Sequence, residues 1–282
     1  MSRWSAPAKL NLCLHVTGRR EDGYHLLQTV FQLIDLNDEI DFELDPSGRI
    51  ERVEEGDSAA LAGVASEDDL CVRAARALRA RCPGPEGVRI RLRKRIPLGG
   101  GLGGGSSDAA TTLCALNQLW NTGQSSQTLE QLGLRLGADV PLFVRGVSAV
   151  GEGVGELLTP IELPPAWFLL LHPGVAVPTR EVFQAPELTR NSPKLTIAAL
   201  LTGPGRNDCE AVVRARFPEV ADALDWLGRF ASAQLTGTGA CVFARFESAA
   251  AAERVAARVP DRWRTWVARG LARSPMLERL GR

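Results

Sequence analysis

A run of glycines near the middle of the chain constrains its fold and function more than any other sequence feature. Six of the seven residues 99–105 are glycine, with Pro97 and Leu98 before them and Ser106 and Ser107 after them. Each glycine costs roughly 0.5–1 kcal/mol of conformational entropy on folding, but it lets a ligand approach the backbone closely. The run therefore predicts that the backbone of this segment, free of side chains, is approached closely by a ligand.

The flanking patterns place this run between a strand and a helix. Residues 88–96 alternate, with Val88, Ile90 and Leu92 on one face and arginines on the other, and residues 107–120 have a helical pattern. Exposed amides and a helix N-terminus together bind anions, so we predict a phosphate loop. A flexible linker is the alternative, but linkers seldom join a patterned strand to a patterned helix.

Two common phosphate loops do not fit the run. A Walker A loop needs a lysine directly after its last glycine, and none follows here. Gly99-x-Gly101-x-x-Gly104 formally matches the dinucleotide-binding fingerprint. That fingerprint also needs an acidic residue about twenty positions later, at the end of a second strand. Position 124 is Gln124, in a loop after a helix, so the sequence indicates a third kind of phosphate loop.

Composition excludes several other classes of protein. The 33 basic and 33 acidic residues cancel, whereas a nucleic-acid binder normally has a basic excess. The six cysteines contain no C-x-x-C pair, which favours buried, reduced thiols over a zinc site or a disulfide scaffold. Residues 1–14 lack the apolar segment of a signal peptide, and the longest apolar stretch, 167–171, is too short to span a membrane. We expect a cytoplasmic protein with no membrane or nucleic-acid partner.

The remaining pattern predicts an α+β protein of two domains, residues 1–155 and 156–282, separated near a Gly- and Pro-rich stretch at 151–165. We expect Ser66 to cap the first helix, and Ser106 and Ser107 to cap the helix after the glycine run. Expected strands cover residues 9–16, 39–44, 88–96, 167–172, 241–246 and 263–268, and expected helices cover 66–81, 107–120, 128–136, 208–217, 220–230 and 248–259.

Several segments together resemble the GHMP kinase superfamily. The strand, glycine run and helix resemble its phosphate loop, and the other matching segments occur in the order found in that superfamily. Residues 45–65 and 247–282 carry no matching motif. The other matching segments are 6–12 (APAKLNL), 20–25 (REDGYH), 29–31 (TVF), 136–141 (LGADVP) and 235–240 (LTGTGA).

The resemblance implies a two-domain GHMP kinase fold, with an N-terminal ribosomal-protein-S5-domain-2-like domain, a C-terminal ferredoxin-like domain and an active site in the cleft between them. It implies transfer of the γ-phosphoryl group of ATP to a small-molecule hydroxyl, with Mg²⁺. The branch it favours phosphorylates the 2-hydroxyl of a cytidine diphosphate-linked methylerythritol in the non-mevalonate isoprenoid pathway. The implied ATP-binding residues are Pro97, Leu98, Gly99, Gly100, Gly101, Leu102, Gly103, Gly104, Gly105, Ser106 and Ser107.

Asp139 and Lys9 have a structural interpretation beside the functional one. Asp139 follows Gly137 and precedes Pro141, which is typical of a helix N-cap, and Lys9 alone is typical of a solvated lysine at a strand end. The resemblance instead implies that Asp139 is the catalytic base and Lys9 its partner. Such a pair about 4 Å apart is worth roughly 4 kcal/mol before desolvation. The metal ligands stay unassigned, although Ser106 and Ser107 are candidates.

For the substrate, the resemblance implies four contacts. Tyr24 and Phe183 would stack on the two faces of the cytosine ring, His25 would bond its edge, and Asn11 would contact the methylerythritol hydroxyls. Aromatic faces accept any base, so hydrogen bonds must select cytosine. Taken alone, Tyr24, the only tyrosine, is more typical of packing.

Two rival functions stay open. The first is a GHMP kinase with a different acceptor, which would not need two aromatic faces. The second is a non-catalytic nucleotide- or RNA-binding module, because the N-terminal fold resembles a ribosomal-protein domain. The zero net charge and the presence of both Lys9 and Asp139 argue against this second rival. The sequence leaves the oligomeric state open.

Overall fold

A long two-stranded hairpin runs through the computed structural model, which describes residues 2–53, 67–82, 86–203 and 205–281. Strand β1 (Ser2–Arg19) pairs antiparallel with β2 (His25–Asp45) along its whole length. Only residues 9–16 and 39–44 of these strands were expected. Register shifts beside Pro7, Asn11 and Val16 interrupt the alternation of β1, and β2 is buried on both faces in its middle, so neither strand shows a simple period of two.

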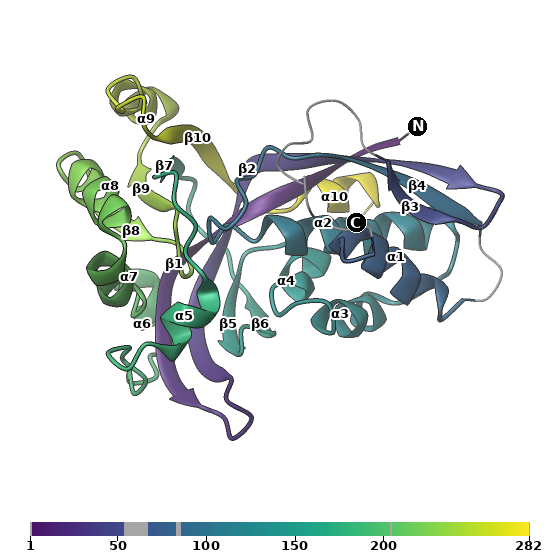
Figure 1. Ribbon diagram of the computed structural model, residues 1–282, viewed down its shortest axis with the longest axis horizontal. Coiled ribbons are helices and arrows are strands. Elements are labelled where there is room, and N and C mark those ends of the chain that lie inside the picture. Colours follow the sequence, from purple (N-terminus) through teal and green to yellow (C-terminus); the bar gives the residue numbers. More distant parts are fainter. Residues whose placement is uncertain (1, 54–66, 83–85, 204, 282) are drawn as a thin grey trace.

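Helices of the N-terminal half pack against this hairpin and its neighbouring strands (Figure 1). Strand β4 pairs with β2 and with the unexpected β3. Strand β5 forms a hairpin with β6 that extends into the Gly- and Pro-rich stretch expected to separate the domains. The elements are β3 (Ile50–Val53), α1 (Leu70–Arg79), β4 (Gly87–Arg93), α2 (Gly104–Leu119), α3 (Ser126–Leu134), α4 (Val140–Arg145), β5 (Ala149–Gly153) and β6 (Leu157–Pro160).

The C-terminal half has the β-α-β-β-α-β order of a ferredoxin-like domain, as the resemblance implied. Its four strands lie in the order β10-β7-β9-β8, with helices in the two crossovers. The elements are β7 (Trp167–His172), α5 (Thr179–Gln184), α6 (Ile197–Thr202), α7 (Glu210–Arg216), α8 (Pro218–Gly228), β8 (Ala233–Leu235), β9 (Val242–Phe246), α9 (Ala249–Ala256), β10 (Arg264–Leu271) and α10 (Pro275–Arg279).

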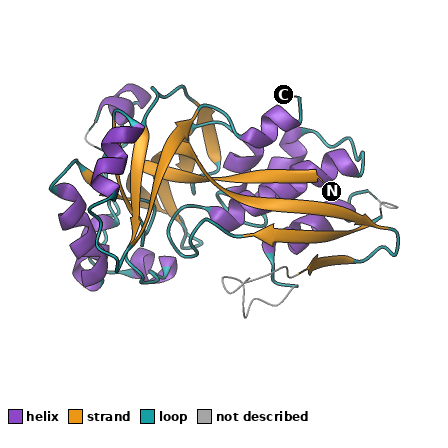
Figure 2. Cartoon of the chain, turned by 90° about the horizontal axis from the view of Figure 1, so that it is seen from above, coloured by secondary structure: helices purple, strands orange, loops and turns teal. Residues whose placement is uncertain are grey.

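The two halves share strands and are not separate bodies. Leu14 and Val16 of β1 pack in the core of the C-terminal half, whereas Met276 of α10 packs in the core of the N-terminal half. Strand β10 also pairs with β2, so one sheet crosses the molecule, with helices gathered at its two ends (Figure 2). The division after residue 155 stays a prediction.

Helix α1 begins at Leu70, and its N-cap is Asp69. The carboxylate of Asp69 accepts hydrogen bonds from the backbone amides of Cys71 and Val72. Ser66, the expected cap, lies outside the described residues.

The six cysteines are free, and five of them are buried, as expected. Among the described residues, no helix combines the length and the apolar character needed to cross a membrane.

Candidate active site

The glycine loop ends in a helix that no side chain caps. Helix α2 begins at Gly104, and its N-cap is Gly103, in the left-handed region at φ 70°. Ser106 and Ser107, the expected caps, lie inside the first turn, so that expectation is wrong: a glycine holds the capping position and has no side chain to offer. The amides of this first turn therefore remain available to an anion.

Backbone hydrogen bonds hold the loop from two sides. Lys9 N on β1 donates to Leu102 O at 3.0 Å. Residues 235–240, the last of the matching segments, are called the third motif below. Ala240 N of this motif donates to Gly99 O at 3.1 Å, and Cys241 N donates to Gly100 O at 3.2 Å. The loop is thus fixed between the N-terminal hairpin and a segment of the C-terminal half.

One glycine of the loop is also required by packing. A Cβ on Gly101, which has φ +72°, would lie 2.3 Å from Thr236 O. Thr236 is completely buried, and its Oγ1 accepts from Asn11 N at 3.0 Å. The glycines therefore serve close packing between the two halves as well as access for a ligand. Sequence reasoning did not single out Thr236, whose only signal was its place in the third motif.

Lys9 and Asp139 lie together beside this loop. Lys9 is 4% exposed, and its Nζ donates to Asn11 Oδ1 at 2.5 Å and to Gly101 O at 2.9 Å. Nζ lies 3.5 Å from Asp139 Oδ2. Asp139 occupies the N-cap position of α4, but its side chain makes no capping hydrogen bond and is 30% exposed. The carboxylate faces the ammonium and the solvent, which a base acting on a substrate requires.

Asn11 holds the lysine in place. It is 3% exposed, and its Nδ2 donates to Thr29 Oγ1 at 2.8 Å while its Oδ1 accepts from Lys9. Thr29 Oγ1 donates in turn to Cys13 O at 2.6 Å. This chain of hydrogen bonds orients the ammonium. Thr29 was noted only as part of the motif at residues 29–31, and its hydroxyl role has no signal in the sequence.

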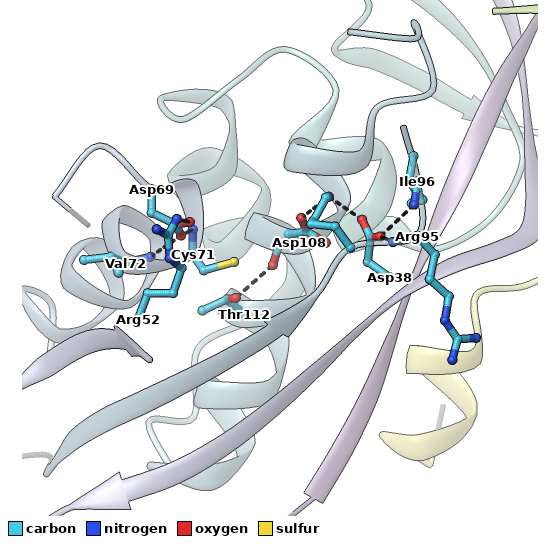
Figure 3. A network of polar contacts seen from close by, with 10 residues as sticks. Asp38, Arg52, Asp69, Cys71, Val72, Arg95, Ile96, Asp108 and Thr112 are labelled. Atoms are coloured by element: carbon cyan, nitrogen blue, oxygen red, sulfur yellow. Dashed lines mark hydrogen bonds and ion pairs between the residues drawn. The ribbon is translucent and has the colours of Figure 1, made fainter. Parts of the chain in front are cut away.

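A buried charge cluster lies under the start of α2 (Figure 3). Lys94 forms ion pairs with Asp38 and with Asp108, where Nζ and Oδ2 are 2.7 Å apart. A Cβ on Gly104 would lie 3.2 Å from Lys94 Nζ, so the cluster contacts the first residue of the helix. No sequence pattern pointed to this cluster, because its three charges come from separate elements.

Two carboxylates share the single ammonium of this cluster. Burial raises the pKa of Asp108 to about 8, since burial and the neighbouring Asp38 outweigh the attraction of Lys94. Burial alone would lower the pKa of Lys94, but the carboxylates of Asp108 and Asp38 outweigh it and raise that pKa. Oδ1 of Asp38 also accepts hydrogen bonds from the backbone amides of Arg95 and Ile96, at 2.6 and 2.9 Å.

The predicted substrate residues come together only in part. The rings of His25 and Phe183 are stacked, with centroids 5.0 Å apart and 24° between their planes. Tyr24 is 64% exposed at the surface. Arg190, which sequence reasoning missed, donates from Nε to His25 Nε2 at 3.1 Å. Burial, then Arg190 and then Arg19 lower the pKa of His25.

The described residues contain no group of three or more His, Cys, Asp or Glu side chains that could hold a metal ion. Protein-bound Mg²⁺ usually takes one or two side-chain oxygens and completes its shell with water and substrate phosphates, so the site fits that mode of binding. Ser107 is fully buried, with Oγ lacking a hydrogen bond. Ser106 is half-buried near Gly137, where a Cβ would lie 3.4 Å from Ser106 Oγ. Ser106 is therefore the side chain of the loop helix that is offered to a metal ion.

Comparisons with known proteins agree with this geometry. Residues 69–147 match the GHMP kinases N terminal domain, and residues 187–265 match the GHMP kinases C terminal domain. A protein of Nitrosococcus oceani named 4-diphosphocytidyl-2-C-methyl-D-erythritol kinase is 54% identical over 278 residues, covering 99% of this chain and 98% of that protein. A protein of Thiobacillus denitrificans with the same name is 57% identical over 273 residues, covering 97% and 96%.

Solved structures extend the likeness to the fold. The crystal structure of a 4-(cytidine 5'-diphospho)-2C-methyl-D-erythritol kinase has a TM-score of 0.81 at 35% identity, covering 95% of this chain and 99% of that one. A mevalonate kinase, with a TM-score of 0.69 at 15% identity over 96% of this chain and 99% of that one, shares the fold alone. The chain therefore belongs to the GHMP kinase family, in its branch of 4-diphosphocytidyl-2-C-methyl-D-erythritol kinases.

Proposed function

We propose that the chain transfers the γ-phosphoryl group of ATP to the 2-hydroxyl of 4-diphosphocytidyl-2-C-methyl-D-erythritol in the non-mevalonate isoprenoid pathway. The relatives of this name span nearly the whole chain, which supports the substrate. The observation that carries the chemistry is the approach of Lys9 Nζ to Asp139 Oδ2, at 3.5 Å, beside the uncapped start of α2. These parts suit phosphoryl transfer, which depends chiefly on positioning and charge stabilisation.

In the proposed mechanism, Asp139 accepts the proton of the 2-hydroxyl while that oxygen bonds to the γ-phosphorus. The bond from the γ-phosphorus to the bridging oxygen breaks, and ADP leaves. Lys9 holds the carboxylate of Asp139 in place through their ion pair and orients the attacking oxygen, while the amides of residues 99–107 hold the phosphates. Bound Mg²⁺ would neutralise phosphate charge, and Ser106 would offer it a hydroxyl oxygen.

The substrate side of the proposal uses the end of the β1–β2 hairpin. His25 and Phe183 form a stacked pair there, and the adjacent Tyr24 has an exposed ring that could cover the second face of a cytosine. Asn11 lies next to Lys9, where the methylerythritol hydroxyls would have to reach. The proposed compartment is the cytoplasm, because all six cysteines are free thiols.

The test is Asp139→Asn in a coupled assay of ADP release, with Asp261→Asn, the same change at an exposed position, as the control. We expect kcat to fall by about 10²–10⁴ while ATP affinity is nearly unchanged, because a base is lost but the phosphate loop is intact. Near-normal kcat in Asp139→Asn would show that the base is a different residue. ADP release with mevalonate, homoserine or galactose, but not with the cytidine substrate, would favour the rival acceptors.

A further inference from the structure

Arg190 joins the two rings of the predicted nucleobase subsite. Its Nη2 donates to Phe183 O at 3.0 Å and to Ala185 O at 2.7 Å, and its Nη1 donates to Leu188 O at 3.0 Å. The carbonyl of Phe183 lies in the last turn of α5 and the other two follow that helix, so the guanidinium fixes the backbone that carries Phe183. Its remaining nitrogen, Nε, donates to His25 Nε2 at 3.1 Å. One side chain therefore positions both members of the stacked pair.

The contact with Arg190 also decides which nitrogen of His25 carries a proton. Arginine has five N–H donors and no acceptor, so Nε2 of His25 must be the acceptor and must carry no proton. A neutral imidazole has a single N–H, which then lies on Nδ1. A second proton would set an N–H of His25 against an N–H of Arg190, and the lowered pKa of His25 agrees with this conflict.

The Nδ1–H of His25 is left for a ligand. Within the described part of the chain, no acceptor lies within hydrogen-bond distance of it. The Nδ1 atom is also not completely buried, so a ligand can reach it. The ring it belongs to is stacked on Phe183. The pair thus presents one N–H donor beside an aromatic surface, which suits a flat heterocycle with an acceptor on its edge.

We propose that Arg190 is a positioning residue of the nucleobase subsite: by occupying Nε2 it fixes His25 as an Nδ1–H donor, so that the site selects a ring presenting an acceptor. This rests on the proposed function, because that function places the nucleobase at His25 and Phe183. If Arg190 only closed the turn after α5, the tautomer of His25 would not depend on it.

The first measurement needs no ligand and no activity. Long-range ¹H–¹⁵N NMR spectra distinguish the tautomers of histidine, and the chain has only three histidines, so His25→Gln identifies the signals of His25. We expect the Nδ1–H tautomer in the unmodified protein, and a change to Nε2–H or to a mixture in Arg190→Met. A wild-type His25 protonated on Nε2 would overturn the proposal.

The second measurement is steady-state kinetics of Arg190→Met with the cytidine substrate. We expect its KM for this substrate to rise about tenfold, equivalent to about 1.4 kcal/mol, while kcat and the KM for ATP change little. Arg229→Met is the matched control, because Arg229 Nε also donates to a helix-end carbonyl, that of Trp226 at 3.3 Å, away from the stacked rings. An unchanged KM for the cytidine substrate would overturn the proposal.

Arg190→Lys keeps the test decisive if Arg190→Met does not fold. Lysine retains one charged donor but cannot reach His25 and the carbonyls together, so we expect an intermediate KM and a partly retained Nδ1–H tautomer. A fully wild-type KM and spectrum in this variant would count against the proposal. Failure of the proposed function would look different: the unmodified protein would release no ADP with the cytidine substrate, whatever tautomer the spectra show.

Discussion

Burial separates the roles of two aspartates near the glycine loop. The side chain of Asp139 is 30% exposed and faces Lys9, so it can meet a substrate. Asp108 is 3% exposed, and its Oδ1 has no hydrogen-bond partner, so it can act on the loop only through Lys94 and α2. A buried carboxylate that shares its lysine with a second one favours its protonated form.

Asp108→Asn should therefore change how stability depends on pH. The folded-state pKa of Asp108 is raised to about 8, above that of an unfolded aspartate, so the native protein binds the extra proton and loses stability as pH rises towards 8. Asparagine resembles the protonated form and lacks this loss. Between pH 6 and pH 9, the wild-type free energy of unfolding should fall relative to the variant by about 2–3 kcal/mol. Urea unfolding of both proteins at pH 6 and at pH 9 measures this difference. An equal change of the free energy of unfolding in wild type and variant would contradict the prediction.

The sequence predicted residues that lie in motifs and missed those that act through the fold. Lys9 and Asp139 are 130 positions apart in the chain, yet the resemblance paired them and the structure places them 3.5 Å apart. Lys94, which stands between Arg93 and Arg95, and Arg190 gave no signal, because the sequence does not show whether a basic side chain is solvated or buried. Their roles depend on which elements meet around them.

Among the elements, the loop before α2 combines a phosphate-binding shape with tight packing. Its conformation was predictable, since a glycine run between a patterned strand and a patterned helix has few other uses. The contacts that require particular glycines were not, because Thr236 comes from a segment more than 130 residues later. Similarly, the alternation of β4 was read correctly, whereas most of β2 was missed because it is buried on both faces.

Gly101→Ala tests the packing of this loop. Gly101 and Gly123 both have positive φ, +72° and +65°, but an added Cβ would meet Thr236 O at 2.3 Å in the first and nothing within 4 Å in the second. Gly123→Ala should cost only the backbone strain, about 1–2 kcal/mol. Gly101→Ala should also displace the loop and raise the KM for ATP about tenfold or more. Thermal unfolding and ATP kinetics on both variants measure this; a wild-type KM in Gly101→Ala would show that the loop tolerates the shift.

Across the entire chain, the β1–β2 hairpin belongs to both halves. Its residues Trp4 and Phe31 pack in the N-terminal core, and Leu14 and Val16 pack in the C-terminal core. The site is assembled from both halves as well, because the glycine loop is bonded to β1 and to the third motif. Sequence patterns indicated two domains but could not show this sharing, since long-range strand pairing leaves no local periodicity.

Shared strands predict that the two halves unfold together. Leu224 on α8 is 3% exposed and packs in the C-terminal core, so Leu224→Ala should destabilise that core by about 2–5 kcal/mol. If the hairpin couples the halves, the slowest-exchanging amides of α2, in the other core, should lose the same free energy of protection as those of β9. Hydrogen exchange followed by mass spectrometry measures both, with Leu201→Ala, at a position 41% exposed, as the control. Unchanged protection in α2 would mean that each half unfolds independently, despite the strands they share.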